Sequence, residues 1–293
     1  MFRSIAKDIR ASFDYGNMIV RLIIINVAVC VFTALTEAFF PFFYQSTILP
    51  YIALPGDPMI LLYRPWTLIT HMFVHTGIWH LAWNMITLYW FGNIAGDLLG
   101  DKRILPVYIM GGLMGALFYI LSFNFLSGIG TMALGASAAV LALVFTAVAI
   151  APDYVVHLIL IGPVRIKYVG LVIFFLDLIG TRSGDNSGGH IAHMGGTLFG
   201  ILFVYLLRSG TDLSQIFSFG SRITQMRKRP VSFTKTKLKV AHRANTISNN
   251  NQTTGNALDI SRKVDQILDK IKSSGYDSLT DEEKEILYKA SKS

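Results

Sequence analysis

Long apolar runs separated by short polar breaks dominate the chain from about residue 18 to residue 208. A helix that crosses a membrane needs about 20 mainly apolar residues. Six runs meet or approach that length, with expected bounds 18–40, 67–95, 104–126, 134–150, 166–180 and 190–207. The pattern predicts an all-α integral membrane protein whose six helices form one core of residues 18–208.

The composition agrees with this prediction, because 52% of the residues are hydrophobic and only 15% are charged. Basic residues gather in the breaks that would lie on the same side as both chain ends, whereas the opposite side would carry only Arg64 and Arg182. The positive-inside rule therefore places both termini in the cytoplasm. We expect a multi-pass protein of a bacterial inner (cell) membrane.

Two connections between the runs have features of their own. Residues 41–66 contain five prolines and many apolar side chains, so we expect this loop to dip into the membrane interface. Residues 154–166 form an amphipathic piece that should lie along the membrane surface. The turn at residues 75–77 should lie inside the second run or at one end of it.

Residues 1–17 predict an amphipathic helix on an anionic, cytoplasmic membrane surface. The apolar positions recur at helical spacing and are Phe2, Ile5, Ile9 and Phe13. A mitochondrial transit peptide is the alternative, and Asp8 and Asp14 count against it.

The polar tail, residues 209–293, changes in composition twice along its length. Residues 209–256 form a basic juxtamembrane segment and a polar linker, which favour contact with acidic lipid headgroups. We expect no nucleic-acid binding, because interleaved aromatic residues and a folded motif are missing. Residues 257–293 predict a small helical region in which Thr280 caps the last helix. Because so small a region has little core, it should dock on a partner of unknown identity, dock on a second copy, or be only marginally stable alone.

Several polar side chains lie within the apolar runs, where such groups are costly and usually face a functional cavity. They are His75, His80 and Asn84 in the second run, Ser137 in the fourth and His193 in the sixth. Small residues around Ser137 and His193 would let two helices approach within hydrogen-bond distance. A serine becomes a nucleophile when a base such as imidazole takes its proton. Taken singly, however, such a serine is more often a packing residue, and such a histidine a satisfied buried group.

His80 and Asn84 lie one helical turn apart on the same face. Side-chain donors aimed at one point stabilise the oxyanion of a tetrahedral intermediate. The sequence thus offers a nucleophile, a base and oxyanion donors in three different runs.

With these motifs the chain resembles the rhomboid family of intramembrane serine proteases over about residues 15–208. The matching stretches follow the family's order: Pro65-Trp66, then HMFVHTGIWHLAWN at 71–84, then Gly135-Ala136-Ser137, then Ala192-His193-Met194-Gly195-Gly196. The resemblance implies a six-transmembrane-helix rhomboid-like bundle with no cofactor or metal, to which the sequence adds a small cytoplasmic helical C-terminal tail. It also implies that the substrates are transmembrane segments of other proteins, cleaved through an acyl-enzyme.

Position by position, the resemblance implies that Ser137 is the nucleophile and His193 the general base of a dyad without an acidic third member. It implies that His80 and Asn84 contribute to the oxyanion hole together with the backbone N–H of Ser137.

The resemblance further implies that His75 is structural and organises solvent, and that Gly135 allows close helix contact. Three positions depart from the family pattern. Ala138 replaces a glycine after the serine, Leu141 stands where some members place an aromatic ring against the histidine, and Thr67 replaces an arginine after the tryptophan.

Two other functions remain open. A metal-dependent membrane hydrolase could use four histidines, although no acidic residue lies among them and no HExxH motif occurs. These four are His71, His75, His80 and His193. A membrane-protein binding or quality-control factor could use the same groove without cleavage. Of the other histidines, we expect His190 at the cavity mouth and His157 at the membrane interface.

Overall fold

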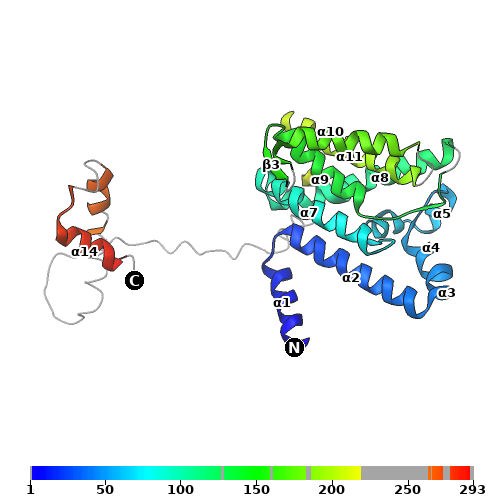
Figure 1. The fold of residues 1–293 in the computed structure, drawn as a ribbon, viewed down its shortest axis with the longest axis horizontal. Coiled ribbons are helices and arrows are strands. Elements are labelled where there is room, and N and C mark those ends of the chain that lie inside the picture. The colour runs from blue at the N-terminus through cyan, green and yellow to red at the C-terminus, as the bar shows by residue number, and fades with distance from the viewer. Residues whose placement is uncertain are drawn as a thin grey trace, which may run out of the picture. The chain divides into compact units, whose positions relative to one another are not determined.

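The computed structural model describes residues 2–126, 129–158, 161–182, 186–218, 263–264, 266–272 and 278–290. The chain divides into two compact units, residues 1–229 and 230–293. In the first unit, helices pack side by side in one bundle (Figure 1). Residues 219–256 of the predicted basic segment and polar linker, 209–256, lie outside the described residues.

Six helices of 14 to 22 residues occupy the predicted apolar runs. They are α2 (Met18–Phe39), α7 (Ile78–Leu99), α8 (Ile104–Phe125), α9 (Ser137–Ile150), α10 (Ile166–Gly180) and α11 (Ser187–Arg208). Among the described residues, three segments are long and apolar enough to cross a membrane, namely Met18–Phe39, Asp101–Phe125 and Ser187–Arg208. This unit also contains α1 (Phe2–Tyr15), η3 (Asp101–Arg103) and η4 (Leu213–Ser218).

The second predicted run, 67–95, is not one helix. Its first part forms α6 (Thr67–Thr70) and η2 (His71–Phe73), and α7 begins only at Ile78. Gly77 precedes α7 in an extended conformation, with φ at 175°. Glycine loses more conformational freedom in a helix than other residues, which favours a break at this position.

The loop between α2 and α6 folds into short elements: α3 (Pro41–Phe43), η1 (Tyr44–Ile48), α4 (Leu49–Ile52), β1 (Leu54–Pro55) and α5 (Pro58–Tyr63). β1 pairs antiparallel with β2 (Met132–Ala133), just before α9. The Arg64 guanidinium donates to the Pro50 carbonyl at 2.8 Å, and the Trp66 indole donates to the Tyr51 carbonyl at 2.8 Å. These two hydrogen bonds hold the loop together, and the β1–β2 pairing links it to the segment before α9.

The piece expected as one amphipathic stretch at 154–166 is an antiparallel hairpin of β3 (Val155–Leu158) and β4 (Gly162–Arg165). Exposed and half-buried positions alternate along both strands, which is the periodicity of a strand. At its base, Lys167 and Arg165 donate to the Asp153 carboxylate at 2.6 and 3.2 Å. The hydrogen bond from Lys167 in particular lowers the pKa of Asp153.

The helix α9 forms the centre of the first unit, and every residue from Ala138 to Ala147 is buried. A helix that is apolar all round belongs to a core. Its neighbours approach it through glycines, where an added Cβ would overlap the backbone or an alanine side chain of α9. These glycines are Gly111 and Gly115 of α8 and Gly196 and Gly200 of α11.

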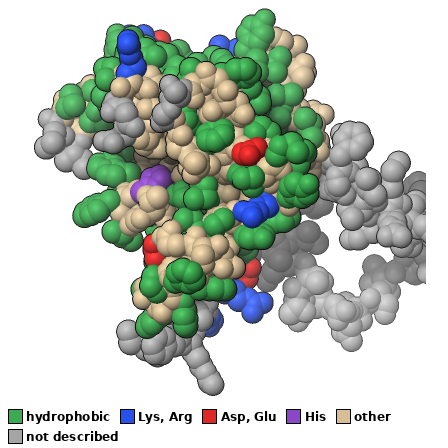
Figure 2. All heavy atoms as spheres, turned by 90° about the vertical axis from the view of Figure 1, so that its right-hand side faces the viewer, with side chains coloured by type: hydrophobic (Ala, Val, Ile, Leu, Met, Phe, Trp, Pro, Cys, Tyr) green, Lys and Arg blue, Asp and Glu red, His purple; other side chains and the backbone are tan. Residues whose placement is uncertain are grey.

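Large apolar side chains are exposed on the outside of the first unit. Figure 2 shows hydrophobic side chains over much of one face, with few charged groups between them. Phe32, Trp79 and Tyr205 are 63%, 77% and 68% exposed. Exposed apolar surface on this scale marks contact with lipid or protein rather than with water.

In the second unit, residues 266–272 are helical and α14 spans Asp281–Ala290. The Thr280 N–H donates to the Glu283 carboxylate at 2.8 Å, and the Glu283 N–H donates to the Thr280 hydroxyl at 3.4 Å. This reciprocal pair is a capping box, so Thr280 caps the last helix as predicted. Lys270 donates to the same carboxylate at 2.8 Å and lowers the pKa of Glu283.

Candidate active site

A cavity of about 1070 Å³ lies among α7, α9, α10 and α11. Its lining includes Ser137, His193, His80, Asn84, Asp177 and His190. Four residues that the sequence singled out from three separate runs therefore line one cavity. His190 also lines it, as expected, and Asp177 was not predicted.

The serine and histidine are in direct contact. The Ser137 hydroxyl lies 2.6 Å from Nε2 of His193, the distance of a strong hydrogen bond. Ser137 is the first residue of α9, and His193 lies in the second turn of α11. The hydroxyl can donate to the ring nitrogen, which is the arrangement that lets imidazole take the proton of an attacking serine.

Glycine makes this contact possible. Gly196 lies one turn after His193, and a Cβ there would overlap the carbonyl oxygen of Ala138. The backbones of α9 and α11 consequently touch beside the Ser137–His193 pair, and small residues are the usual means of such close helix approach in membranes.

An acidic residue completes the chain of contacts. Oδ1 of Asp177 lies 2.8 Å from Nδ1 of His193 and 2.9 Å from Nδ1 of His190. The Asp177 side chain is 11% exposed, and the histidines are 19% and 27% exposed. The resemblance had implied a dyad without an acidic member, and here a carboxylate contacts the far side of the imidazole.

Sequence reasoning missed Asp177, although a signal was present. It is the only acidic residue in the run 166–180. An ionisable side chain within an apolar helix indicates a functional site. No motif of the resemblance includes α10, so this residue received no role.

His80 and Asn84 lie on α7 and face the same cavity as Ser137. The Asn84 amide donates one hydrogen to the His80 carbonyl at 2.8 Å, which leaves its second hydrogen for another acceptor. A Cβ on Gly135 would lie 2.8 Å from Cε1 of His80. Gly135 thus makes room for an imidazole ring, at a φ of +126° that disfavours other residues.

His75 and His71 are buried behind the cavity, each 5% exposed. The His71 ring donates from Nδ1 to the Thr67 carbonyl at 2.8 Å. His75 packs its ring edge-on against His80 with centroids 5.1 Å apart, and neither of its nitrogens has a hydrogen-bond partner among the described protein atoms.

Metal-ligand atoms also converge here. Within the described part of the chain, the group that could hold a metal ion consists of Asp177, His190 and His193, whose ligand atoms lie within 4.8 Å of one another. It shares only His193 with the four histidines considered from the sequence.

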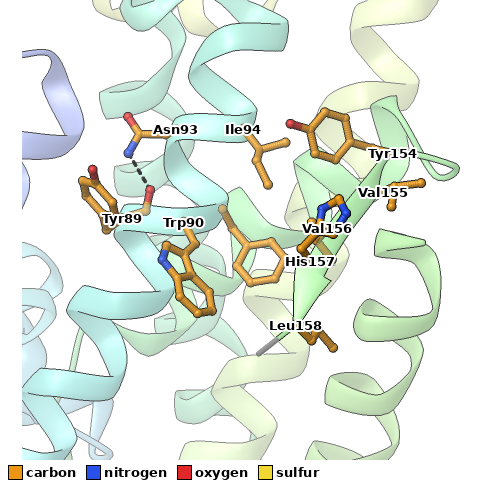
Figure 3. Close-up of a pocket in the computed structure, with 10 residues that line it drawn as sticks. Tyr89, Trp90, Asn93, Ile94, Tyr154, Val155, Val156, His157 and Leu158 are labelled. Atoms are coloured by element: carbon orange, nitrogen blue, oxygen red, sulfur yellow. Dashed lines mark hydrogen bonds between the residues drawn. The ribbon is translucent and has the colours of Figure 1, made fainter. Parts of the chain in front are cut away.

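A second, smaller cavity of about 420 Å³ lies between α7 and β3 (Figure 3). Tyr89, Trp90 and Asn93 of α7 line one side, and His157 is on the other. Its lining is mainly aromatic and aliphatic, and the Ser137–His193 pair is not part of it. His157 is therefore separate from the active-site cavity.

Known proteins with similar sequences include the following three. RHOMBOID-like protein 12, mitochondrial, of Arabidopsis thaliana is 28% identical over 157 residues, which is 49% of this chain and 47% of that protein. Presenilin-associated rhomboid-like protein, mitochondrial, of Homo sapiens is 29% identical over 142 residues, 45% of this chain and 35% of that protein. Rhomboid protease GlpG of Salmonella newport (strain SL254) is 24% identical over 70 residues, 24% of this chain and 25% of that protein. The chain spans less than half the length of each relative.

The expected bacterial inner membrane is wrong by this comparison. The Arabidopsis and human relatives, which cover more of the chain than the Salmonella protease does, are both named as mitochondrial. The prediction rested on the distribution of basic residues, which indicates the orientation of a protein in its membrane but not which membrane contains it. The alternative interpretation of residues 1–17 as a transit peptide stays open.

Family models match two parts of the chain. Residues 260–293 match a family of unknown function, DUF6576. The Rhomboid domain model matches residues 63–210, which is half of the chain and includes every site residue predicted from the sequence. The chain belongs to the rhomboid family.

Proposed function

We propose that the protein is an intramembrane serine endopeptidase that cleaves transmembrane segments of other membrane proteins. The observation that carries the proposal is the 2.6 Å contact between the Ser137 hydroxyl and Nε2 of His193 in a cavity among apolar helices. Family membership supports it, and one relative is named as a protease.

The chemistry would run in two halves. His193 takes the Ser137 proton as the hydroxyl oxygen attacks the peptide carbonyl, and the tetrahedral oxyanion accepts hydrogen bonds from His80, Asn84 and the Ser137 backbone N–H. His193 then gives its proton to the leaving amine, and the carbonyl carbon stays bonded to Ser137 as an ester. Water, deprotonated by His193, attacks this ester and releases the new carboxyl end and the free serine.

The setting would be a six-span bundle of α2, α7, α8, α9, α10 and α11. Peptide bonds in a regular helix are shielded by its own hydrogen bonds. We therefore expect substrates with helix-weakening glycine, proline or other small residues near the cut. The contact of the basic stretch with acidic lipids and the partner of residues 257–293 stay predictions.

A fluorophosphonate probe tests the nucleophile directly. The full chain should be labelled at Ser137, and Ser137→Ala and His193→Ala should each abolish labelling as well as cleavage of tagged single-span proteins. The double variant should be scarcely worse than either single one, because members of a catalytic unit are strongly non-additive. Ser122→Ala is the matched control: it removes a buried serine of α8 whose hydroxyl donates to the Tyr119 carbonyl, and labelling should be unchanged.

The same experiment separates the other functions. Labelling or cleavage that survives Ser137→Ala would overturn the protease assignment. Cleavage that a chelator abolishes would favour the metal-dependent hydrolase. Retention of membrane proteins without labelling or cleavage would favour the binding factor.

A further inference from the structure

Two histidines share one carboxylate oxygen beside the proposed nucleophile. Nδ1 of His193 and Nδ1 of His190 lie 2.8 and 2.9 Å from the same Oδ1 of Asp177. His190 precedes His193 by three residues on α11, so both rings project from one helix face towards α10. Gly180, one turn after Asp177, leaves the space that the His190 ring occupies.

This geometry determines which nitrogen of His193 carries hydrogen. A carboxylate only accepts hydrogen bonds, so a ring nitrogen that faces it at 2.8 Å must be the N–H donor. In neutral imidazole the other nitrogen, Nε2, then has the free lone pair. That lone pair faces the Ser137 hydroxyl at 2.6 Å, as a general base requires.

The cavity supplies little else to orient this ring. The ring contact of His193 among the described residues is an edge-on one with His190, at 5.6 Å between centroids. Leu141, one turn after Ser137, lines the cavity with an aliphatic side chain that offers neither a ring nor a hydrogen bond. The polar group that holds Nδ1 is therefore the Asp177 carboxylate.

A largely buried carboxylate in an apolar helix is costly unless charge-assisted hydrogen bonds compensate for its lost hydration. His193 provides one such bond, and His190 provides the second on the same oxygen. His190 thus keeps the Asp177 carboxylate in place when His193 changes protonation state.

We propose that Asp177 is a positioning residue that turns the Ser137–His193 pair into a triad, and that His190 is the second donor that holds Asp177. The proposal rests on the serine-protease function proposed above. Asp177 itself touches no substrate and takes no proton. It fixes the neutral tautomer of His193 and stabilises the imidazolium that forms when Ser137 attacks.

The test measures the rate and the affinity of fluorophosphonate labelling separately on the full chain. Asp177→Asn keeps the shape but loses the negative charge and replaces one carboxylate oxygen with a donating NH2 group, so the maximal labelling rate should fall by about a hundredfold or more with unchanged probe affinity. Asp177→Glu should recover part of this loss. His190→Gln should reduce the rate less, by roughly tenfold. Asp97→Asn, an exposed carboxylate elsewhere on α7, is the control and should leave the rate unchanged.

Proton NMR of histidine-labelled protein provides a readout that a merely structural role would not affect. A far-downfield Nδ1–H signal should be present in the wild type and absent in Asp177→Asn and in His193→Ala. The wild-type spectrum needs no substitution, so the proposal can be tested even if Asp177→Asn fails to fold. Absence of this signal from the folded wild type would overturn it.

The remaining outcomes are distinct. Labelling of Asp177→Asn at the wild-type rate overturns the positioning role while the protease function stands, whereas labelling of Ser137→Ala overturns both. Added Zn²⁺ tests whether the cluster of Asp177, His190 and His193 binds a metal ion. If Asp177→Asn labels normally and only loses sensitivity to inhibition by Zn²⁺, the cluster is a metal site and the positioning role is wrong.

Discussion

The two halves of the active-site cavity are built differently. On the α9–α11 side, backbones touch at Gly196 and a short hydrogen bond joins Ser137 to His193. On the α7 side, the polar residues follow an interruption between two helices at Gly77. A Cβ added to Gly77 would meet nothing within 4 Å. Under the proposed mechanism, the first half would hold the reacting groups at a fixed separation. The second half would present donors to a charge that exists only in the transition state.

The histidines show the same contrast. His190 and His193 share a carboxylate, which sets the orientation of both rings. His75 has no hydrogen-bond partner among the described atoms and is held by packing against His80. A carboxylate therefore orients the histidines on the α10–α11 side, whereas His75 behind α7 is oriented by ring packing.

A matched pair of glycine substitutions should have the largest effect. Gly196→Ala places a Cβ against the Ala138 carbonyl, which belongs to the backbone and cannot rotate away, so α9 and α11 must separate. We expect a loss of about 1–3 kcal/mol in the free energy of unfolding. Labelling of Ser137 should fall by about a hundredfold or more, since a misplacement of about 1 Å can cost that much.

The same change at Gly77 is the control. Its φ of 175° is accessible to any residue and the space around it is open. Thermal unfolding and labelling of Gly77→Ala should match the wild type, or stability should rise slightly because the unfolded chain loses freedom. Equal effects at both glycines would remove the contrast between the two halves.

Asn84→Ala tests the α7 half and should have the next largest effect. The variant should fold and bind the probe, but its labelling rate should drop by up to about a hundredfold, because one oxyanion donor is lost while others remain. Asn93→Ala is the matched control, since its amide also donates to the carbonyl four residues earlier on α7, at 2.6 Å. An unchanged rate in Asn84→Ala, in detergent and in bilayers, would exclude the oxyanion role.

The helices could be predicted and the connections could not, for a physical reason. A helix in lipid satisfies its own backbone, so apolar composition suffices to locate it, and six helices occur in the expected runs. The break before α7 follows a segment held by a long-range contact, from the Gly135 N–H to the His71 carbonyl. The β3–β4 hairpin depends on pairing across a turn. Apolar composition alone predicts neither the break nor the hairpin.

The site was predictable where its residues follow each other in known motifs. Ser137, His193, His80 and Asn84 line one cavity, and each belongs to such a motif. Asp177 comes from a helix without one, and its partnership with His193 spans 16 residues and two helices. Sequence reasoning could have flagged a carboxylate in an apolar run, but only the packing of α10 on α11 shows which base it contacts.

The smallest expected effects come from substitutions of two buried histidines. His71 and His75 are equally buried, but only His71 has a hydrogen-bond partner among the described atoms. His71→Leu removes the ring hydrogen bond to the Thr67 carbonyl, which still accepts the backbone N–H of residue 71, so the free energy of unfolding should fall by about 0.5–1.5 kcal/mol. His75→Leu removes two unpaired polar atoms from an apolar site, so its stability should stay within about 1 kcal/mol of the wild type or rise. Because His75 only packs against His80, its loss should change the labelling rate far less than Asn84→Ala does. A loss as large as that of Asn84→Ala would instead mean that His75 organises the water used in deacylation, and that polar contacts govern the α7 half as well.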